Sequence, residues 1–281
     1  MGKQSEQPCL RLISWNMNHS PKAWTFLLSS DPLPDVALLQ EALKPQKVPC
    51  WSTPTADEPW QIHGYVMKFC TAVVGLSDRV KGRPLATRRI GETGEDKLSV
   101  SLPGTIALAE ISIAGGETVT VISTYSTWEY SFSKSQQIFA DASAHRIISD
   151  ISALSCSPKG HHLIVAGDWN IFHGYGDDGS DYWKARYQTV FSRMEALGLM
   201  FVGPQYPGGI LADSNPGYFS SDSKNVPTLR KGGAGKPATA RDQLDFVFAS
   251  SSLCDRLRVK ALNTAEEWGP SDHCRITIDL W

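Results

Sequence analysis

The sequence lacks the features that mark several large classes of protein. No apolar stretch approaches the length of about 18 residues that a membrane-spanning helix needs. Residues 1–6 contain no apolar core of a secretory signal. The six cysteines form no C-x-x-C pair, and no histidine stands near them at the spacing of a zinc site. We therefore expect a cytoplasmic protein with reduced thiols and no membrane partner.

An excess of charge of one sign is also missing. The 27 basic and 29 acidic residues give a net charge of -2, and the isoelectric point is near 6.4. This balance argues against a protein that coats nucleic acid by bulk charge, so a polyanionic ligand would need a local basic patch. With 281 residues and 41% hydrophobic residues, the chain can bury a sizeable core, in one large domain or two small ones.

The most informative stretch is the short apolar run 163–166 and the Gly-Asp-Trp-Asn that follows it. The run is typical of a strand buried on both faces. Strand alternation would point the side chains of Asp168 and Asn170 to the same side. A carboxylate can orient or deprotonate a water, and an amide can donate to an anionic oxygen. A strand followed by an Asx turn explains the same letters, so this stretch alone leaves both interpretations open.

Other predicted strands, apolar or alternating, end in the same way. Residues 10–15 lead to Asn16, residues 36–39 lead to Gln40 and Glu41, and residues 118–124 lead to Tyr125. A single polar residue after a strand is usually only solvated. The repetition of such polar residues after successive strands favours a functional role for them over simple solvation.

Two basic segments could face an anion. Gly232–Lys236 suggests a P-loop, but Arg230 stands where its first glycine belongs and Pro237 where Ser or Thr is required. The remaining basic residues form a candidate phosphate-binding loop, whose alternative is a solubilising loop: Arg230, Lys231, Lys236 and Arg241. The basic residues between positions 79 and 89 allow the same two interpretations.

Five stretches in this order resemble the endonuclease/exonuclease/phosphatase superfamily of metal-dependent phosphoesterases. They are Ser14-Trp15-Asn16, Leu39-Gln40-Glu41, Gly167-Asp168-Trp169-Asn170, Leu244-Asp245-Phe246-Val247-Phe248 and Ser271-Asp272-His273. Each is weak alone, but together they span nearly the whole chain. The resemblance implies one α+β domain over residues 1–281, a two-sheet sandwich flanked by helices in four layers (α/β/β/α), with the active site at one rim.

The resemblance also implies a metal site. Glu41 would bind Mg²⁺ or Mn²⁺, with Asn16 and Asp272 nearby. Oxygen ligands suit these hard ions and would be poor for zinc. A phosphodiester repels hydroxide, so such a site must neutralise charge and fix a water in line with the leaving oxygen.

The remaining predicted residues are catalytic by the same resemblance. Asp168 would position the attacking water, and Asn170 would hold a non-bridging phosphate oxygen. His273, oriented by Asp245, would stabilise or protonate the pentacovalent phosphate. Tyr125 completes the set, although many members carry a histidine there.

The substrate stays open at this point. The apurinic-site endonuclease branch carries a tyrosine at the position of Tyr125, but the lysine that follows its Gln-Glu-Thr is missing here, where the chain reads Gln40-Glu41-Ala42-Leu43. We expect a divalent-metal-dependent phosphodiesterase whose substrate is nucleic acid. The alternatives are a phosphatase acting on a small molecule or lipid headgroup, and a catalytically idle binding module.

Overall fold

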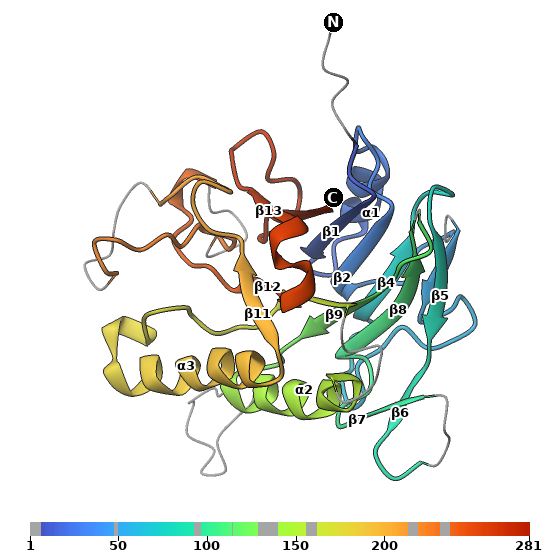
Figure 1. The fold of residues 1–281 in the computed structure, drawn as a ribbon, viewed down its shortest axis with the longest axis horizontal. Helices are drawn as coiled ribbons and strands as arrows, with labels where there is room; N and C mark the ends of the chain where they lie inside the picture. The colour runs from blue at the N-terminus through green and yellow to red at the C-terminus, as the bar shows by residue number, and fades with distance from the viewer. Residues whose placement is uncertain are drawn as a thin grey trace, which may run out of the picture.

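Two β-sheets face each other in the computed structural model, which describes residues 7–47, 50–92, 97–113, 115–128, 140–155, 162–212, 219–230 and 237–281 (Figure 1). Within these residues the first sheet has the strand order β13 (Leu257–Leu262), β14 (Arg275–Leu280), β1 (Leu10–Asn16), β2 (Val36–Ala42), β4 (Cys70–Gly75) and β3 (Trp51–Thr53). The second has the order β11 (Leu199–Gly203), β12 (Asp245–Ser250), β10 (Leu163–Asp168), β9 (Thr118–Tyr125), β8 (Ile106–Ser112) and β5 (Lys81–Leu85). A small parallel pair joins β6 (Thr87–Arg89) to β7 (Leu98–Val100).

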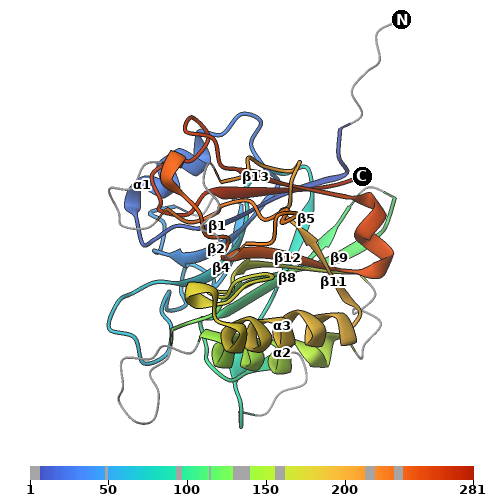
Figure 2. The same cartoon turned by 90° about the vertical axis from the view of Figure 1, so that its left-hand side faces the viewer.

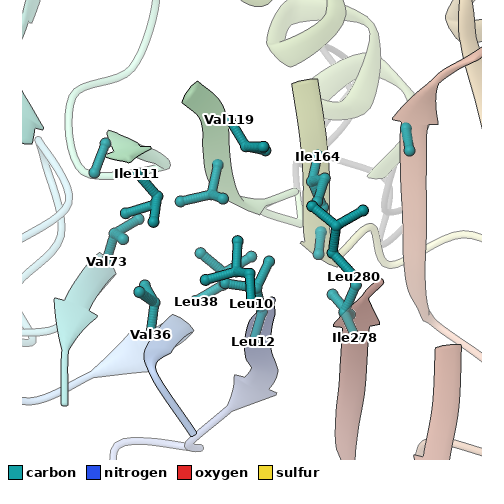
Figure 3. Packing of buried hydrophobic residues seen from close by; sticks show 14 of the residues in the cluster. Leu10, Leu12, Val36, Leu38, Val73, Ile111, Val119, Ile164, Ile278 and Leu280 are labelled. Atoms are coloured by element: carbon teal, nitrogen blue, oxygen red, sulfur yellow. The ribbon is translucent and has the colours of Figure 1, made fainter. Parts of the chain in front are cut away.

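The main core lies between the two sheets, because alternate residues of each strand point inward. Leu10 and Leu12 of β1 meet Val119 of β9 and Ile164 of β10 in this layer (Figure 3). Ile13 and Trp15, further along β1, belong to the opposite, outer face of the first sheet. These strands are apolar along nearly their whole length because both of their faces are covered.

Helices cover the two outer faces unequally. α2 (Ala140–Ser155) and α3 (Asp181–Ala196) lie side by side against the second sheet (Figure 2). The outer face of the first sheet carries α1 (Pro21–Leu28), whose Trp24 and Leu27 are buried against it. Three short 3-10 helices complete the described structure: Asp177–Gly179, Pro237–Thr239 and Ser251–Arg256. The predicted α+β two-sheet sandwich flanked by helices is confirmed, with only one eight-residue helix described on the first sheet.

No helix in the described part of the chain is long and apolar enough to cross a membrane. Five of the six cysteines lie in that part, and all five are free thiols.

Candidate active site

The polar strand ends meet at one rim of the sandwich. β1 and β2 run parallel, with Asn16 paired to Gln40, and β9 and β10 run parallel, with Tyr125 paired to Asp168. β12 runs antiparallel to β10 and starts at Asp245, directly opposite Asp168. Two parallel pairs therefore end where an antiparallel neighbour begins, so all these side chains reach the same edge.

The sequence around Asp168 is fixed by close packing. A Cβ atom on Gly167 would lie 1.9 Å from the backbone oxygen of Thr124, so only glycine allows β10 to approach β9 this closely. Trp169 is completely buried, and its ring packs edge-on against Phe248 with the ring centroids 5.2 Å apart. Asp168 is thus held between two anchored neighbours.

Asp168 and Asn170 do come together, but strand alternation is not the reason. β10 ends at Asp168, and Asn170 has a left-handed backbone with φ of 49°. This turn folds Asn170 back, so that its backbone N–H donates to Asp168 Oδ1 at 3.0 Å and its Nδ2 donates to Asp168 Oδ2 at 3.2 Å. The Nδ2 of Asn170 also donates to the backbone oxygen of Ser126 at 2.8 Å.

Glu41 has a similarly unusual backbone. Its φ is 46°, and the pairing of β2 with β4 shifts between Leu39 and Ala42, on either side of it. A left-handed conformation costs a residue with a side chain roughly 1–2 kcal/mol. Such strain persists where the surroundings enforce it and is concentrated at functional sites. The bulge turns the Glu41 carboxylate toward the rim.

Asn16 links the two carboxylates. Its Nδ2 donates to Glu41 Oε1 at 3.2 Å and to Asp168 Oδ2 at 2.9 Å, while its Oδ1 accepts the backbone N–H of Asn18 at 2.9 Å. The Asn16 amide therefore holds the carboxylates of Glu41 and Asp168 in position. Its predicted place among the metal ligands stays a prediction.

His273 lies between the carboxylates of Asp168 and Asp245. Its Nδ1 is 2.8 Å from Asp245 Oδ2, and its Nε2 is 3.8 Å from Asp168 Oδ2. The backbone oxygen of His273 accepts Trp15 Nε1 at 2.9 Å, which ties the histidine to β1. Asp245 can thus fix the ring orientation and leave Nε2 facing Asp168.

Burial and charge set the ionisation of this group. Burial raises the pKa of Asp168 to about 7, although the charge of His273 opposes the rise. Burial alone would lower the pKa of His273, but the carboxylates of Asp245 and Asp168 outweigh it and raise the pKa to about 10. A carboxyl group that ionises near neutrality beside a histidine that stays charged is suited to proton transfer.

Glu41, which is partly exposed, and Tyr125, which is buried, form the other side of the site. Burial works to raise the pKa of Glu41, but hydrogen bonds led by those from His19 and Asn16 outweigh it and lower the pKa. Burial and the charges of Glu41 and Asp168 raise the pKa of Tyr125 well above its usual value. The Tyr125 hydroxyl therefore stays protonated and can donate to Glu41.

The sequence did not point to two of the residues found here. His19 Nε2 lies 3.2 Å from Glu41 Oε2, and the backbone oxygen of Ser126 receives the Asn170 amide. The available signal for His19 was its position three residues after Asn16, in the turn that follows the first strand. Ser126 contributes only a backbone atom, so its side chain carries no signal.

Of the predicted basic loop, the structure describes Arg230 and Arg241, and Arg230 lies beside the site. The backbone N–H of Arg230 donates to the backbone oxygen of Asp272 at 2.9 Å, and Leu229 pairs with both Asp242 and His273. Arg241 is exposed next to Asp242. Lys231 and Lys236 lie outside the described residues.

Three residues of the second basic segment, between positions 79 and 89, make contacts away from the candidate site. Arg79 forms an ion pair with Asp35, and Arg83 forms one with Glu110. Lys81 pairs with Ser112, at the end of β8 that lies away from the rim. For these three residues, the contacts and positions favour a structural role over phosphate binding.

The donor groups at the rim fit a divalent ion. Glu41 is held ionised and partly exposed, and Asp272 follows Ser271, whose hydroxyl donates to the backbone oxygen of Asn16 at 2.7 Å. Carboxylate oxygens of this kind suit Mg²⁺ or Mn²⁺. Asp168, Asp245 and His273 also offer ligand atoms within 4.8 Å of one another. In that buried trio, however, His273 Nδ1 is already bonded to Asp245.

No protein-family model and no curated protein sequence matches the chain. Solved structures do match its fold. The AP endonuclease of Leishmania major is 16% identical and has a TM-score of 0.58, with 96% of this chain and 87% of that chain covered. The endonuclease domain of TRAS1, a telomere-specific non-LTR retrotransposon, is 14% identical, with a TM-score of 0.55 and coverage of 96% and 98%. A 3'-5' exonuclease from Neisseria meningitidis is 18% identical, with a TM-score of 0.53 and coverage of 97% and 100%.

These three proteins match nearly the whole chain at low sequence identity. The chain therefore shares the fold of these three nucleases, and the fold that the five sequence stretches implied is confirmed.

Proposed function

We propose that the chain is one catalytic domain that hydrolyses phosphodiester bonds in nucleic acid with the help of Mg²⁺ or Mn²⁺. The observation that carries the proposal is the arrangement at the rim. Asp168, only 1% exposed, is held by Asn16 and Asn170 and lies beside a histidine that a second carboxylate orients. A buried carboxylate with a raised pKa stabilises no fold by itself, which argues against an idle binding module.

Glu41 would hold the ion, with Asn16 and Asp272 beside it, as the ionised carboxylate and the oxygen donors of this set support. When bound, the ion would neutralise charge on the phosphate and polarise its oxygens.

The chain's own residues would carry the proton transfers. Asp168 accepts a proton from the water whose oxygen attacks phosphorus, and the bond to the leaving sugar oxygen breaks. His273, protonated and held by Asp245, donates through Nε2 to the phosphoryl group or the departing oxygen. Tyr125 keeps Glu41 in place through its hydroxyl.

Asn170 would donate to a non-bridging phosphate oxygen. Its amide already bonds to the backbone oxygen of Ser126 at 2.8 Å and to Asp168 at 3.2 Å. The incoming oxygen would replace Asp168 as the acceptor of the longer bond, which would also free a lone pair of Asp168 for the attacking water.

Two observations support nucleic acid as the substrate. The structural neighbours are a retrotransposon endonuclease, an AP endonuclease and an exonuclease. The backbone of Arg230, the first residue of the basic loop, is hydrogen-bonded to that of Asp272, and we infer that the loop supplies basic side chains to phosphates that flank the scissile one. The free thiols of the described part support a reducing, cytoplasmic location.

The test of substrate class is a parallel assay of DNA, RNA, nucleotides and inositol phosphates, each with Mg²⁺ and with Mn²⁺. The proposal predicts cleavage of oligonucleotides. Release of inorganic phosphate from small molecules, with oligonucleotides left intact, would instead establish the phosphatase alternative.

Activity should rise with pH through neutrality. The pKa of Asp168 is raised to about 7, and only the ionised carboxylate can accept a proton. Below the pKa, kcat/KM should therefore fall by about tenfold per pH unit, and it should level off about one unit above it. The measurement is kcat/KM from about pH 5 to about pH 9 at saturating metal. A flat profile over this range would mean that Asp168 does not act as the base.

Binding should weaken steeply with salt if the basic loop contacts a polyanion. Each phosphate contacted contributes a slope of roughly 0.7–0.9 in log affinity against log salt. Alanine at Arg230, Lys231, Lys236 and Arg241 should lower both affinity and slope for oligonucleotides. Binding is measured at several salt concentrations, with Ca²⁺ replacing Mg²⁺ if that blocks turnover.

The matched control for this loop carries alanine at Lys81 and Arg258. Both residues are exposed and lie at the end of the sandwich away from the rim. The control should bind as the wild type does. If the four-alanine variant also binds and cleaves as the wild type does, the loop has no part in substrate binding.

A further inference from the structure

His19 occupies a turn that is fixed against the strand carrying Glu41. The backbone N–H of Met17 donates to the oxygen of Gln40 at 2.8 Å, and the N–H of His19 donates to the oxygen of Glu41 at 3.0 Å. His19 has a left-handed backbone with φ of 40°. Two hydrogen bonds to neighbouring residues of β2 thus hold its side chain next to the Glu41 carboxylate.

The imidazole of His19 is also oriented by packing. Its ring lies against that of Phe69, with centroids 5.2 Å apart and an interplanar angle of 35°. The side chain is 34% exposed, compared with 15% for that of Glu41. The imidazole therefore stands at the open mouth of the site, and its Nε2 faces the carboxylate.

The distance between the two groups is informative. His19 Nε2 and Glu41 Oε2 are 3.2 Å apart. A charge-assisted N–H···O bond is usually about 2.7–2.9 Å long. Two adjacent donors on an octahedral ion with bonds of about 2.1 Å lie about 3.0 Å apart. The observed separation suits a pair of donors to one ion as well as it suits a long ion pair.

We propose that His19 is a ligand of the divalent ion bound at Glu41, so that the site offers one nitrogen donor with its oxygens. This inference rests on the proposed metal-dependent function and refines it. Imidazole is a better ligand for Mn²⁺ than for the harder Mg²⁺. The mixed donor set should make the site prefer Mn²⁺.

The test is Mn²⁺ binding followed by pulsed electron paramagnetic resonance, which detects the ¹⁴N nucleus of a coordinated imidazole without requiring turnover. His19→Asn is the main variant, because asparagine tolerates the left-handed backbone and its shorter side chain withdraws the ligand. His63→Asn is the matched control, since His63 is exposed on the segment before Phe69. Glu41→Gln tests whether the ion is bound at Glu41 at all.

We expect a ¹⁴N coupling in the wild type and in His63→Asn, and its loss in His19→Asn. Calorimetry should show Mn²⁺ affinity about tenfold lower or more in His19→Asn, with a smaller change for Mg²⁺. A coupling that persists in His19→Asn would overturn the inference, because another nitrogen would then be the ligand. Absence of coupling in the wild type, while Glu41→Gln still abolishes binding, would overturn the inference and leave the proposed function intact. Mn²⁺ binding unaffected by Glu41→Gln would contradict both.

Discussion

Asp168→Asn should lower kcat by about 10²–10⁴-fold, the contribution typical of a positioned general base. The amide keeps the shape of the carboxyl group but cannot accept the proton of the attacking water. It also places an NH₂ group among donors, because Asn16 Nδ2 and Asn170 Nδ2 both donate to Asp168 Oδ2. KM should change much less, since the proposed role lies in the chemical step.

The variant must be shown to fold. Losing one acceptor in this buried network costs about 1–3 kcal/mol, which thermal unfolding can detect. Asp255→Asn is a suitable control, because Asp255 is exposed in the 3-10 helix that follows the far end of β12. It should retain wild-type kcat. A folded Asp168→Asn variant with wild-type kcat would remove Asp168 from the mechanism.

Asp245→Asn should lower kcat by about 10²-fold or more, because it disturbs both the orientation and the charge of His273. Asp245 is a positioning residue in this account, acting through the 2.8 Å contact with His273 Nδ1. Its carboxylate is also the foremost charge that raises the pKa of His273 to about 10. Because only protonated His273 can donate, activity should fall as pH rises through that pKa, and removing Asp245 should lower the pKa of His273 and move this alkaline loss to lower pH. A purely structural role would leave the pH profile in place.

The double variant distinguishes two residues that act as one unit from two residues that contribute independently to kcat. If Asp245 acts through His273, then Asp245→Asn combined with His273→Ala should be little worse than His273→Ala alone. Asp279→Asn is the control: it removes a carboxylate that pairs with Arg11 at the far end of the first sheet, and it should leave kcat unchanged. Additive losses in the double variant would show that the pairing has no catalytic role.

The strands that build the rim could be predicted from the sequence because each is marked by its own short run of residues. The apolar run 163–166 became β10 and the run 36–39 became most of β2, since both are covered on two faces. Boundaries were less accurate. The stretch 244–248 enters its strand, β12, only at Asp245, because the backbone N–H of Leu244 donates to the Thr228 hydroxyl at 3.0 Å and not to a neighbouring strand.

The details of the site could not be predicted from local patterns. The contacts between Asp168 and Asn170 depend on a left-handed turn at Asn170. Strand alternation predicted that the two side chains would be neighbours, but it is not what brings them together. His19 meets Glu41 only because the turn after β1 is bonded to the end of β2. Contacts of this kind depend on how distant strands pair, which residue spacing along the chain does not encode.

The central claim is that a divalent ion bound at Glu41 is required for phosphodiester hydrolysis at this rim. The most direct measurement is the rate of oligonucleotide cleavage by wild type and Glu41→Gln during titration with Mg²⁺ or Mn²⁺ after removal of metal by EDTA. We expect no cleavage in EDTA, full recovery of the wild type on adding metal, and a much higher metal requirement for Glu41→Gln. Undiminished cleavage in EDTA, or identical metal titrations for the two proteins, would contradict it.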